Sequence, residues 1–373
     1  MTRVKVGWEQ VHAWRLRRQF VDPRGEADAV GVVGRLCGVQ AQVASAAELA
    51  VRLRQSSPHD GGAERGLADG MLIKTWAMRG TLHVLRPSEA ASCLALIASA
   101  RTWERAAWQR ASGTTPEQIQ ALVEAVSQLL DGASLTRDEL VTKLAEQEQF
   151  APMEEKLRSG WGSMLKPIAW QGALCHGPSR GHRVTFTRPD TAVAGWPGLP
   201  HLDEAVPAVI AAYLGAYGPS TPETFDAWLT RGYLKKSTLR GWFAALGDQL
   251  TEIDVDGQVG YLLTEHADDL ASTSRSTSTH LLGPFDQYVL GPGTNDPHLL
   301  APEHRATVSK AAGWISPIVV VGGRIAGVWE LDDDEVRVSL FPGTPEPPSG
   351  GLDAEVAHVA RAHGRDTLTL RMS

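Results

Sequence analysis

The pattern of apolar and polar positions along the chain repeats one arrangement three times, with helices followed by a short pair of strands. The copy that begins near residue 115 is the most regular. Thr115 and Thr136 are followed three residues later by Gln118 and Glu139, which is the capping-box pattern of a helix N-terminus. The other elements predicted here are a helix over 154–170 and strands over 173–176 and 183–188. Helices followed by a hairpin are the order of a winged helix-turn-helix.

The copies on either side follow the same order. In the third copy, Asp256-Gly257 is typical of a two-residue hairpin turn. In the first copy, Ser45 and Glu48 form a capping-box pattern that predicts a helix starting just after Gln42. The predicted helices of these two copies cover 7–20, 26–38, 46–55, 63–73, 88–112, 201–218, 221–232 and 235–246, and the strands cover 74–79, 81–87, 250–255 and 259–265.

From about residue 280 the period changes from that of helices to the alternation of strands. Strands are predicted over 284–291, 316–331 (with a turn at Gly322-Gly323), 335–341 and 367–372. Short strands separated by turns favour a small antiparallel barrel. The predicted fold class is therefore α+β, with three tandem winged helix-turn-helix units and a C-terminal β-barrel. The corresponding domains are 1–112 (a winged helix with a connecting helix), 113–198, 199–270 and 271–373.

Composition narrows the class of protein. The 373 residues are 43% hydrophobic, which is ordinary for a globular protein. The three cysteines fit no C-x-x-C pattern, and neither a signal peptide nor a membrane span is evident, so a cytoplasmic protein is predicted. The formal net charge of −7 weighs against nucleic-acid binding as a whole. Local basic clusters on an acidic protein nevertheless remain compatible with DNA.

Gln40-Ala41-Gln42 is the most informative short motif. An amide donates and accepts hydrogen bonds but does not titrate, so a site built on this motif would orient a water or a polar ligand. In an extended segment, residues i and i+2 face the same way. In a continuous helix the two side chains would point about 200° apart and could not share a ligand. The predicted helix start at Ser45 favours the extended arrangement.

Four stretches carry a resemblance to a known family: VQAQVAS (39–45), TWAMRGTLHVLRP (75–87), GPFDQYVLG (283–291) and GWISPIVVVGGRIAGVWE (313–330). With the repeat layout, they resemble the winged-helix DNA glycosylases of the AlkZ/YcaQ type over essentially the whole chain. The glutamine–apolar–glutamine motif is similar to that of the AlkZ branch, whereas the YcaQ branch carries aspartate at the last position. The resemblance assigns the catalytic role to Gln40 and Gln42.

The resemblance implies three winged helices around a DNA channel and hydrolysis of the N-glycosidic bond of N7-alkylated purines. It also implies the unhooking of interstrand cross-links and protection of a bacterium that makes an alkylating antibiotic. We expect a monofunctional glycosylase that needs no metal or cofactor, acts as a monomer on damaged double-stranded DNA and lies on the nucleoid. A cross-linked base is tied to the opposite strand, so we expect the site to reach a base left in the duplex rather than one flipped out.

Several charged residues are candidate DNA contacts, each with a structural alternative. Arg79 and His83 of the first hairpin either contact a phosphate or base edge of DNA, or form their hydrogen bonds with the backbone of the hairpin. The remaining candidates are Lys235, Lys236 and Arg240 on a basic helix and His298 in a long loop, where the alternative is a solvated surface. Asp286 is either a turn cap or an active-site acid. Two other functions stay open: a winged-helix regulator without catalysis, and a protein that sequesters the alkylating drug.

Overall fold

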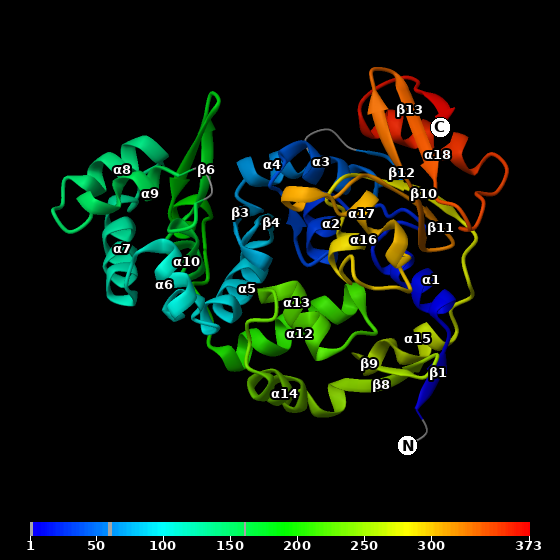
Figure 1. Cartoon of the computed structure of the whole chain (residues 1–373), viewed down its shortest axis with the longest axis horizontal. Coiled ribbons are helices and arrows are strands. Elements are labelled where there is room, and N and C mark those ends of the chain that lie inside the picture. Colours follow the sequence, from blue (N-terminus) through cyan, green and yellow to red (C-terminus); the bar gives the residue numbers. More distant parts are fainter. Residues whose placement is uncertain (1–2, 59–61, 160–161) are drawn as a thin grey trace.

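The computed structural model describes residues 3–58, 62–159 and 162–373, and it is a mixed α and β structure with several sheets. Residues 1–112, 113–198, 199–270 and 271–373 are called the first, second, third and C-terminal segments below. As predicted, the first three segments each place helices before a hairpin, which is β3–β4, β6–β7 and β8–β9 respectively. Figure 1 shows the second segment at the left, the third below, and the C-terminal strands at the upper right, with the first segment between them. The first segment therefore contacts each of the others.

The first segment holds the elements around Gln40. Its helices are α1 (Trp8–Arg18), α2 (Ala29–Arg35), α3 (Ala44–Arg52), α4 (Gly62–Ala68), α5 (Pro87–Ser99) and α6 (Ala106–Ser112), and its strands are β1 (Val4–Val6), β2 (Val39–Gln40), β3 (Ile73–Trp76) and β4 (Leu82–Leu85). The predicted capping box at Ser45 is wrong, because α3 starts at Ala44 after Val43 and has no side-chain cap. Glu48 instead accepts hydrogen bonds from Arg52 and from the backbone N–H of Ala63.

The single connecting helix predicted over 88–112 is also wrong. Helix α5 ends at Ser99, and a short 3-10 turn over Thr102–Glu104 separates it from α6. Arg101 lies in the left-handed region, with φ of 45°, between the two helices. A residue in that conformation cannot continue an α-helix, so the chain changes direction here.

The second segment begins with the two helices whose capping boxes were predicted. Thr115 and Gln118 cap α7 (Pro116–Leu129), and Thr136 and Glu139 cap α8 (Arg137–Ala145). The helix predicted over 154–170 is instead two helices, and residues 160–161 of that range lie outside the described part. The other elements are α9 (Glu154–Arg158), α10 (Leu165–Trp170), α11 (Pro189–Ala192), β5 (Leu135–Thr136), β6 (Cys175–Arg180) and β7 (Arg183–Thr187).

The first two hairpins share one sheet, which was not predicted. Its strand order is β2-β4-β3-β6-β7-β5, and Lys74 of β3 pairs with His176 of β6. The third hairpin pairs instead with the N-terminal strand, because β1 lies parallel to β8. The third segment consists of α12 (Leu202–Tyr217), α13 (Pro222–Thr230), α14 (Lys236–Ala245), α15 (Ala267–Ala271), β8 (Leu250–Val255) and β9 (Gln258–Leu263).

The C-terminal segment is an open sheet, so the predicted β-barrel is wrong. Its strands follow the order β10 (Thr279–Leu282), β11 (Ile318–Val321), β12 (Arg324–Asp332), β13 (Glu335–Leu340) and β14 (Thr369–Met372), without closure. Helix α18 (Gly351–Ala362) buries Leu352, Val356 and Val359 against apolar residues of these strands. Because a helix covers this face, the sheet does not need to close on itself. Two short helices, α16 (Gln287–Leu290) and α17 (Arg305–Val308), lie in the loop before β11.

The strand predicted over 284–291 is likewise replaced by helix α16. Asp286 caps this helix, since its carboxylate accepts the backbone N–H of Tyr288 at 2.8 Å. Its other partner is Arg54, and the side chains of both residues are fully buried. Of the two roles considered for Asp286, the structure therefore shows the cap.

Candidate active site

Gln40 and Gln42 lie where strand β2 leads into helix α3. Val39 and Gln40 pair with Val84 and His83 of β4, and the backbone N–H of Ala41 donates to the carbonyl of Leu82 at 2.7 Å. The side chain of Ala41 is buried, which fixes the middle of the motif against the core. The motif thus begins as an extended strand that ends at Gln40, and the chain bends at Gln42 before α3. Gln40 is buried and Gln42 is exposed.

The orientation of both amides follows from their partners. The Gln40 side-chain carbonyl accepts hydrogen bonds from Arg79 Nη2 at 3.3 Å and from Thr81 Oγ1 at 3.4 Å. The Gln42 side-chain carbonyl accepts the backbone N–H of Leu82 at 3.4 Å. A guanidinium and a backbone N–H can only donate, so the atoms they contact must be the amide oxygens. Both carbonyls are therefore held, by long bonds, on the same stretch of the first hairpin.

This arrangement leaves defined groups for a ligand. The Gln42 oxygen keeps a second lone pair, whereas both lone pairs of the Gln40 oxygen already accept from Arg79 and Thr81, and each amide nitrogen keeps two N–H donors. Because Thr81 and Leu82 are consecutive, the two amides lie side by side at the start of β4. Two neighbouring amides of fixed orientation can hold a water molecule, but they cannot take or give a proton at neutral pH.

Arg79 supports this site from the turn over Met78–Gly80. Its φ of 58° places it in the left-handed region, and its guanidinium points inward. Nη1 donates to the carbonyl of Trp228 in α13 at 3.1 Å, and Nη2 donates to Gln40. Burial lowers the pKa of Arg79 to about 10, so it stays charged at neutral pH. A fixed positive charge therefore lies directly behind the Gln40 amide.

His83 lies opposite Gln40 in the sheet and is completely buried. Its Nδ1 lies 3.0 Å from the carbonyl of Thr81 and must carry the proton, because a carbonyl only accepts. Burial, with the charge of Arg79, lowers the pKa of His83 to about 3. His83 is therefore a neutral side chain beneath Gln40, and it has no surface to offer to a phosphate. Thr81 was missed in the sequence, although it belongs to the same TWAMRGTLH stretch.

The other candidate DNA contacts lie away from this hairpin. Lys235, Lys236 and Arg240 are exposed at the start of α14, at the bottom of Figure 1. In the described part of the chain they form no ion pair, so their charges remain available to an anion. His298 is half-buried and stacks on Trp8, with ring centroids 4.1 Å apart. It lines a cavity of about 590 Å³ between α1, β9 and the loop before α17.

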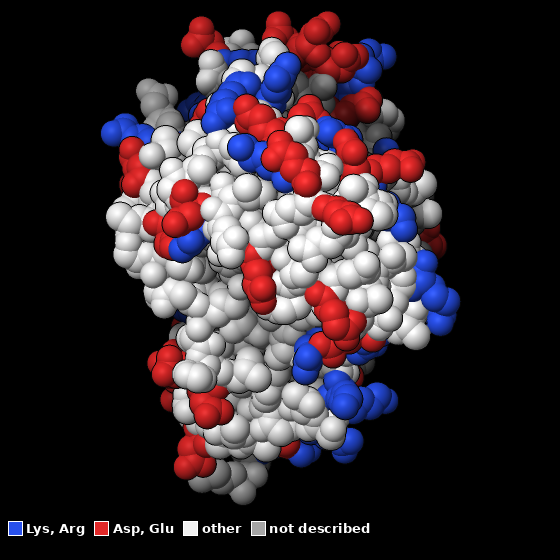
Figure 2. Space-filling model, turned by 90° about the vertical axis from the view of Figure 1, so that its left-hand side faces the viewer, with Lys and Arg blue, Asp and Glu red and all other residues white. Residues whose placement is uncertain are grey.

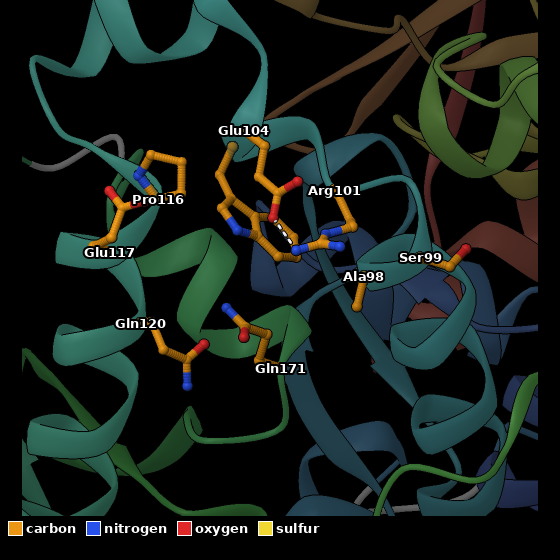
Figure 3. A pocket seen from close by; sticks show the side chains of 9 residues that line it. Ala98, Ser99, Arg101, Glu104, Pro116, Glu117, Gln120 and Gln171 are labelled. Carbon is orange, nitrogen blue, oxygen red and sulfur yellow. Dashed lines mark ion pairs between the residues drawn. The ribbon is translucent and has the colours of Figure 1, made fainter.

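A second cavity among the described residues also lies away from the two amides. It has a volume of about 680 Å³ and lies between the end of α5, the start of α7 and Gln171, with Trp103 in its wall (Figure 3). Arg101 and Glu104 form an ion pair at its rim. Neither Gln40 nor Gln42 lines this cavity or the one at His298. Gln42 is exposed at the surface, whereas Gln40 is buried behind it against Arg79 and Thr81.

Neither a metal-ligand cluster nor a membrane-crossing helix is present among the described residues. Among these residues there is no group of three or more His, Cys, Asp or Glu side chains arranged to hold a metal ion. Within the same ranges, no helix is long and apolar enough to cross a membrane.

Comparisons with known proteins agree with one another. A family model described as DNA glycosylase AlkZ-like matches residues 33–365. A curated protein of Streptomyces sahachiroi, the "Interstrand DNA cross-link repair glycosylase", is 56% identical over 370 residues, which is 99% of this chain and 100% of the relative. The solved structure of Streptomyces sahachiroi DNA glycosylase AlkZ superposes with a TM-score of 0.97, at 56% identity, and covers 99% of this chain and 100% of that one.

Proposed function

The chain belongs to the AlkZ-like DNA glycosylase family, and we propose that it hydrolyses the N-glycosidic bond of N7-alkylated purines, including those in interstrand cross-links. The relative that is 56% identical over 99% of this chain is named for cross-link repair, and this supports the same role here. We assign the catalytic role to Gln40 and Gln42. The observation that carries this assignment is that both amide oxygens are held on consecutive residues of one hairpin.

The chemistry needs little from an acid or a base. Alkylation at N7 places a positive charge on the purine, so the C1′–N9 bond breaks with both electrons passing to the base, which leaves neutral. The sugar becomes oxocarbenium-like, and a water oxygen bonds to C1′. The new oxonium is strongly acidic and gives its proton to solvent. What the enzyme supplies is position: the free lone pair of the Gln42 oxygen and the amide N–H groups of Gln40 and Gln42 hold the water against C1′.

The exposure of Gln42 supports attack on a base that stays in the duplex. Gln42 is exposed, and neither large cavity of the described chain is lined by either glutamine. A base cross-linked to the opposite strand could reach such a site without entering a closed pocket. A nucleotide found rotated into a protein pocket in a DNA complex would contradict this part of the proposal.

The wider organisation is part of the same proposal. Residues 1–112, 113–198 and 199–270 are three winged helices, and residues 271–373 are a separate C-terminal domain. The order of helices before the hairpins β3–β4, β6–β7 and β8–β9 supports this division. The protein acts as a monomer on damaged duplex DNA and lies on the nucleoid.

The test is the release of base from a defined lesion. Duplex DNA carrying a single N7-methylguanine, incubated with the protein and then heated in alkali, should be cut at that position, and a nitrogen-mustard cross-link should be unhooked on a denaturing gel. The same duplex with an unmodified guanine is the control. A winged-helix regulator would retard undamaged DNA in a sequence-specific way and yield no abasic product. A protein that sequesters the drug would bind the free alkylator without DNA.

The release rate should be nearly independent of pH between about 5 and 9. Amides do not titrate, and the two ionisable groups nearest to them titrate outside this window. His83, with a pKa lowered to about 3, protonates only in strong acid, and Arg79, with a pKa of about 10, loses its proton only in strong base. Single-turnover rates across the window test this. A step near pH 6.5, the ordinary range of histidine, would instead assign a titrating role to a histidine.

A further inference from the structure

Three positively charged side chains from different segments lie around the Met78–Gly80 turn beside the two amides. Arg79 is in the turn, Lys166 is on α10 and Arg231 caps the C-terminus of α13. The hairpin β3–β4 lies between α10 and α13 in Figure 1, and both helices contact it. The side of Gly80 faces Lys166: a Cβ built on this glycine would be 3.9 Å from Lys166 Nζ. Arg79 reaches α13 through the Trp228 carbonyl, three residues before Arg231.

The charges of this group repel one another. Burial is the main cause that lowers the pKa of Arg79 and of Lys166, and the charge of Arg231 lowers both further. The geometry agrees, because Lys166 lies beside Gly80 and α13, whose C-terminus Arg231 caps, contacts the Met78–Gly80 turn. Arg79 and Lys166 are half-buried and Arg231 is exposed. The group is thus open to solvent on one side, where an anion could approach.

No acidic side chain of the described residues forms an ion pair with any of the three. Two other arginines of the second segment are paired: Arg158 with Asp138, and Arg180 with Glu139. The face of the molecule in Figure 2 shows basic and acidic side chains interspersed, with no continuous basic stripe. Three cations without an acidic partner among the described residues therefore lie beside the candidate active site of a protein with a net charge of −7.

We propose that Lys166 and Arg231 bind a phosphate of the DNA strand that carries the attacked nucleotide, with Arg79 as a fixed charge behind them. This phosphate site rests on the proposed function and extends it to two residues that the sequence analysis did not select. Arg79 donates to Gln40 Oε1, so the phosphate site and the water-holding amide share one side chain. A phosphate bound here sets the distance between the backbone of the strand and the two amides. The ligand is a backbone phosphate, so binding is independent of base sequence.

The test is the salt dependence of binding to an undamaged fluorescent duplex, measured by anisotropy. Each phosphate contact that is lost reduces the slope of log Kobs against log salt by about 0.9. Because the proposal concerns one phosphate, the double variant Lys166→Gln/Arg231→Gln should show a slope shallower by about 0.9, and each single variant should show a smaller change. The control Lys143→Gln/Arg371→Gln removes the same total charge from exposed positions on α8 and β14 and should change the slope by much less.

A charge-conserving variant separates loss of the contact from loss of the fold. Lys166→Arg/Arg231→Lys keeps both charges and should keep most of the wild-type slope. If the wild type releases N7-methylguanine but the glutamine double variant has the slope of its control, the phosphate site is wrong and the glycosylase function stands. If the slopes change as expected but the wild type releases no base, the phosphate site stands as a DNA contact and the glycosylase function is wrong.

Discussion

Replacing Gln42 by alanine is expected to slow the release of N7-methylguanine by about 10²- to 10³-fold, and Gln40→Ala should do the same. Both changes remove one of two groups that hold the attacking water, and nothing else near it can substitute. His83 has its proton on Nδ1, bonded to Thr81, and Arg79 can only donate. Because the leaving base is already cationic, the loss should appear in the rate of the chemical step. Single-turnover measurements with excess protein report that step directly.

Binding of undamaged duplex should be almost unchanged in these variants, since a neutral amide releases no counterion. Gln149→Ala, at an exposed position beyond α8, is the matched control and should keep the wild-type rate. Gln40→Ala has a second effect to check, because it removes an acceptor from Arg79 and Thr81. Folded Gln40→Ala and Gln42→Ala proteins that both keep the wild-type rate would rule out the water-holding role.

Local signals in the sequence were sufficient for much of this fold. Thr115 and Thr136 cap helices α7 and α8 as predicted, because a capping box lies within four consecutive residues. The turn at Asp256-Gly257 also lies where it was predicted, between β8 and β9. These features depend on neighbouring residues alone, so a single sequence contains the information.

The predictions that were wrong concern features that depend on residues far apart in the chain. Ser45 and Glu48 have the spacing of a capping box. The Glu48 carboxylate, however, accepts a hydrogen bond from the backbone N–H of Ala63 at the start of α4, 15 residues along the chain. The C-terminal strands do not close into a barrel because α18, which alternation did not reveal, covers them. Likewise, the sheet shared by the first two hairpins depends on a pairing between Lys74 and His176.

The candidate site likewise combines features that local sequence predicted with features that depend on distant residues. That Gln40 and Gln42 lie just before a helix was predictable, although the strand ends at Gln40 and the chain bends at Gln42. The direction of the Arg79 side chain was not, because it depends on the carbonyl of Trp228, which is 149 residues away. The phosphate site proposed at Lys166 and Arg231 requires three segments to meet, and no periodicity in the sequence indicates that meeting.

Asp286→Asn is expected to lower the free energy of unfolding by about 3–5 kcal/mol, the largest effect on stability that we predict. Asp286 accepts two hydrogen bonds from Arg54, at 2.7 and 2.8 Å, and both side chains are 0% exposed. Asparagine keeps the size of the side chain and an oxygen that can cap α16. It removes the negative charge, however, and leaves the Arg54 guanidinium buried without a counter-charge. Urea denaturation of the wild type and the variant measures the difference.

Two further variants show whether the uncompensated charge is the cause. Asp69→Asn breaks the exposed pair with Arg65, whose side chains are 74% and 59% exposed, and should cost less than about 1 kcal/mol. Arg54→Met added to Asp286→Asn removes the orphaned charge and should recover part of the loss. An Asp286→Asn protein within about 1 kcal/mol of the wild type would contradict the argument. Arg54 lies two residues beyond α3, the helix that begins two residues after Gln42. The buried pair therefore joins the C-terminal segment to the helix at whose start the candidate site lies.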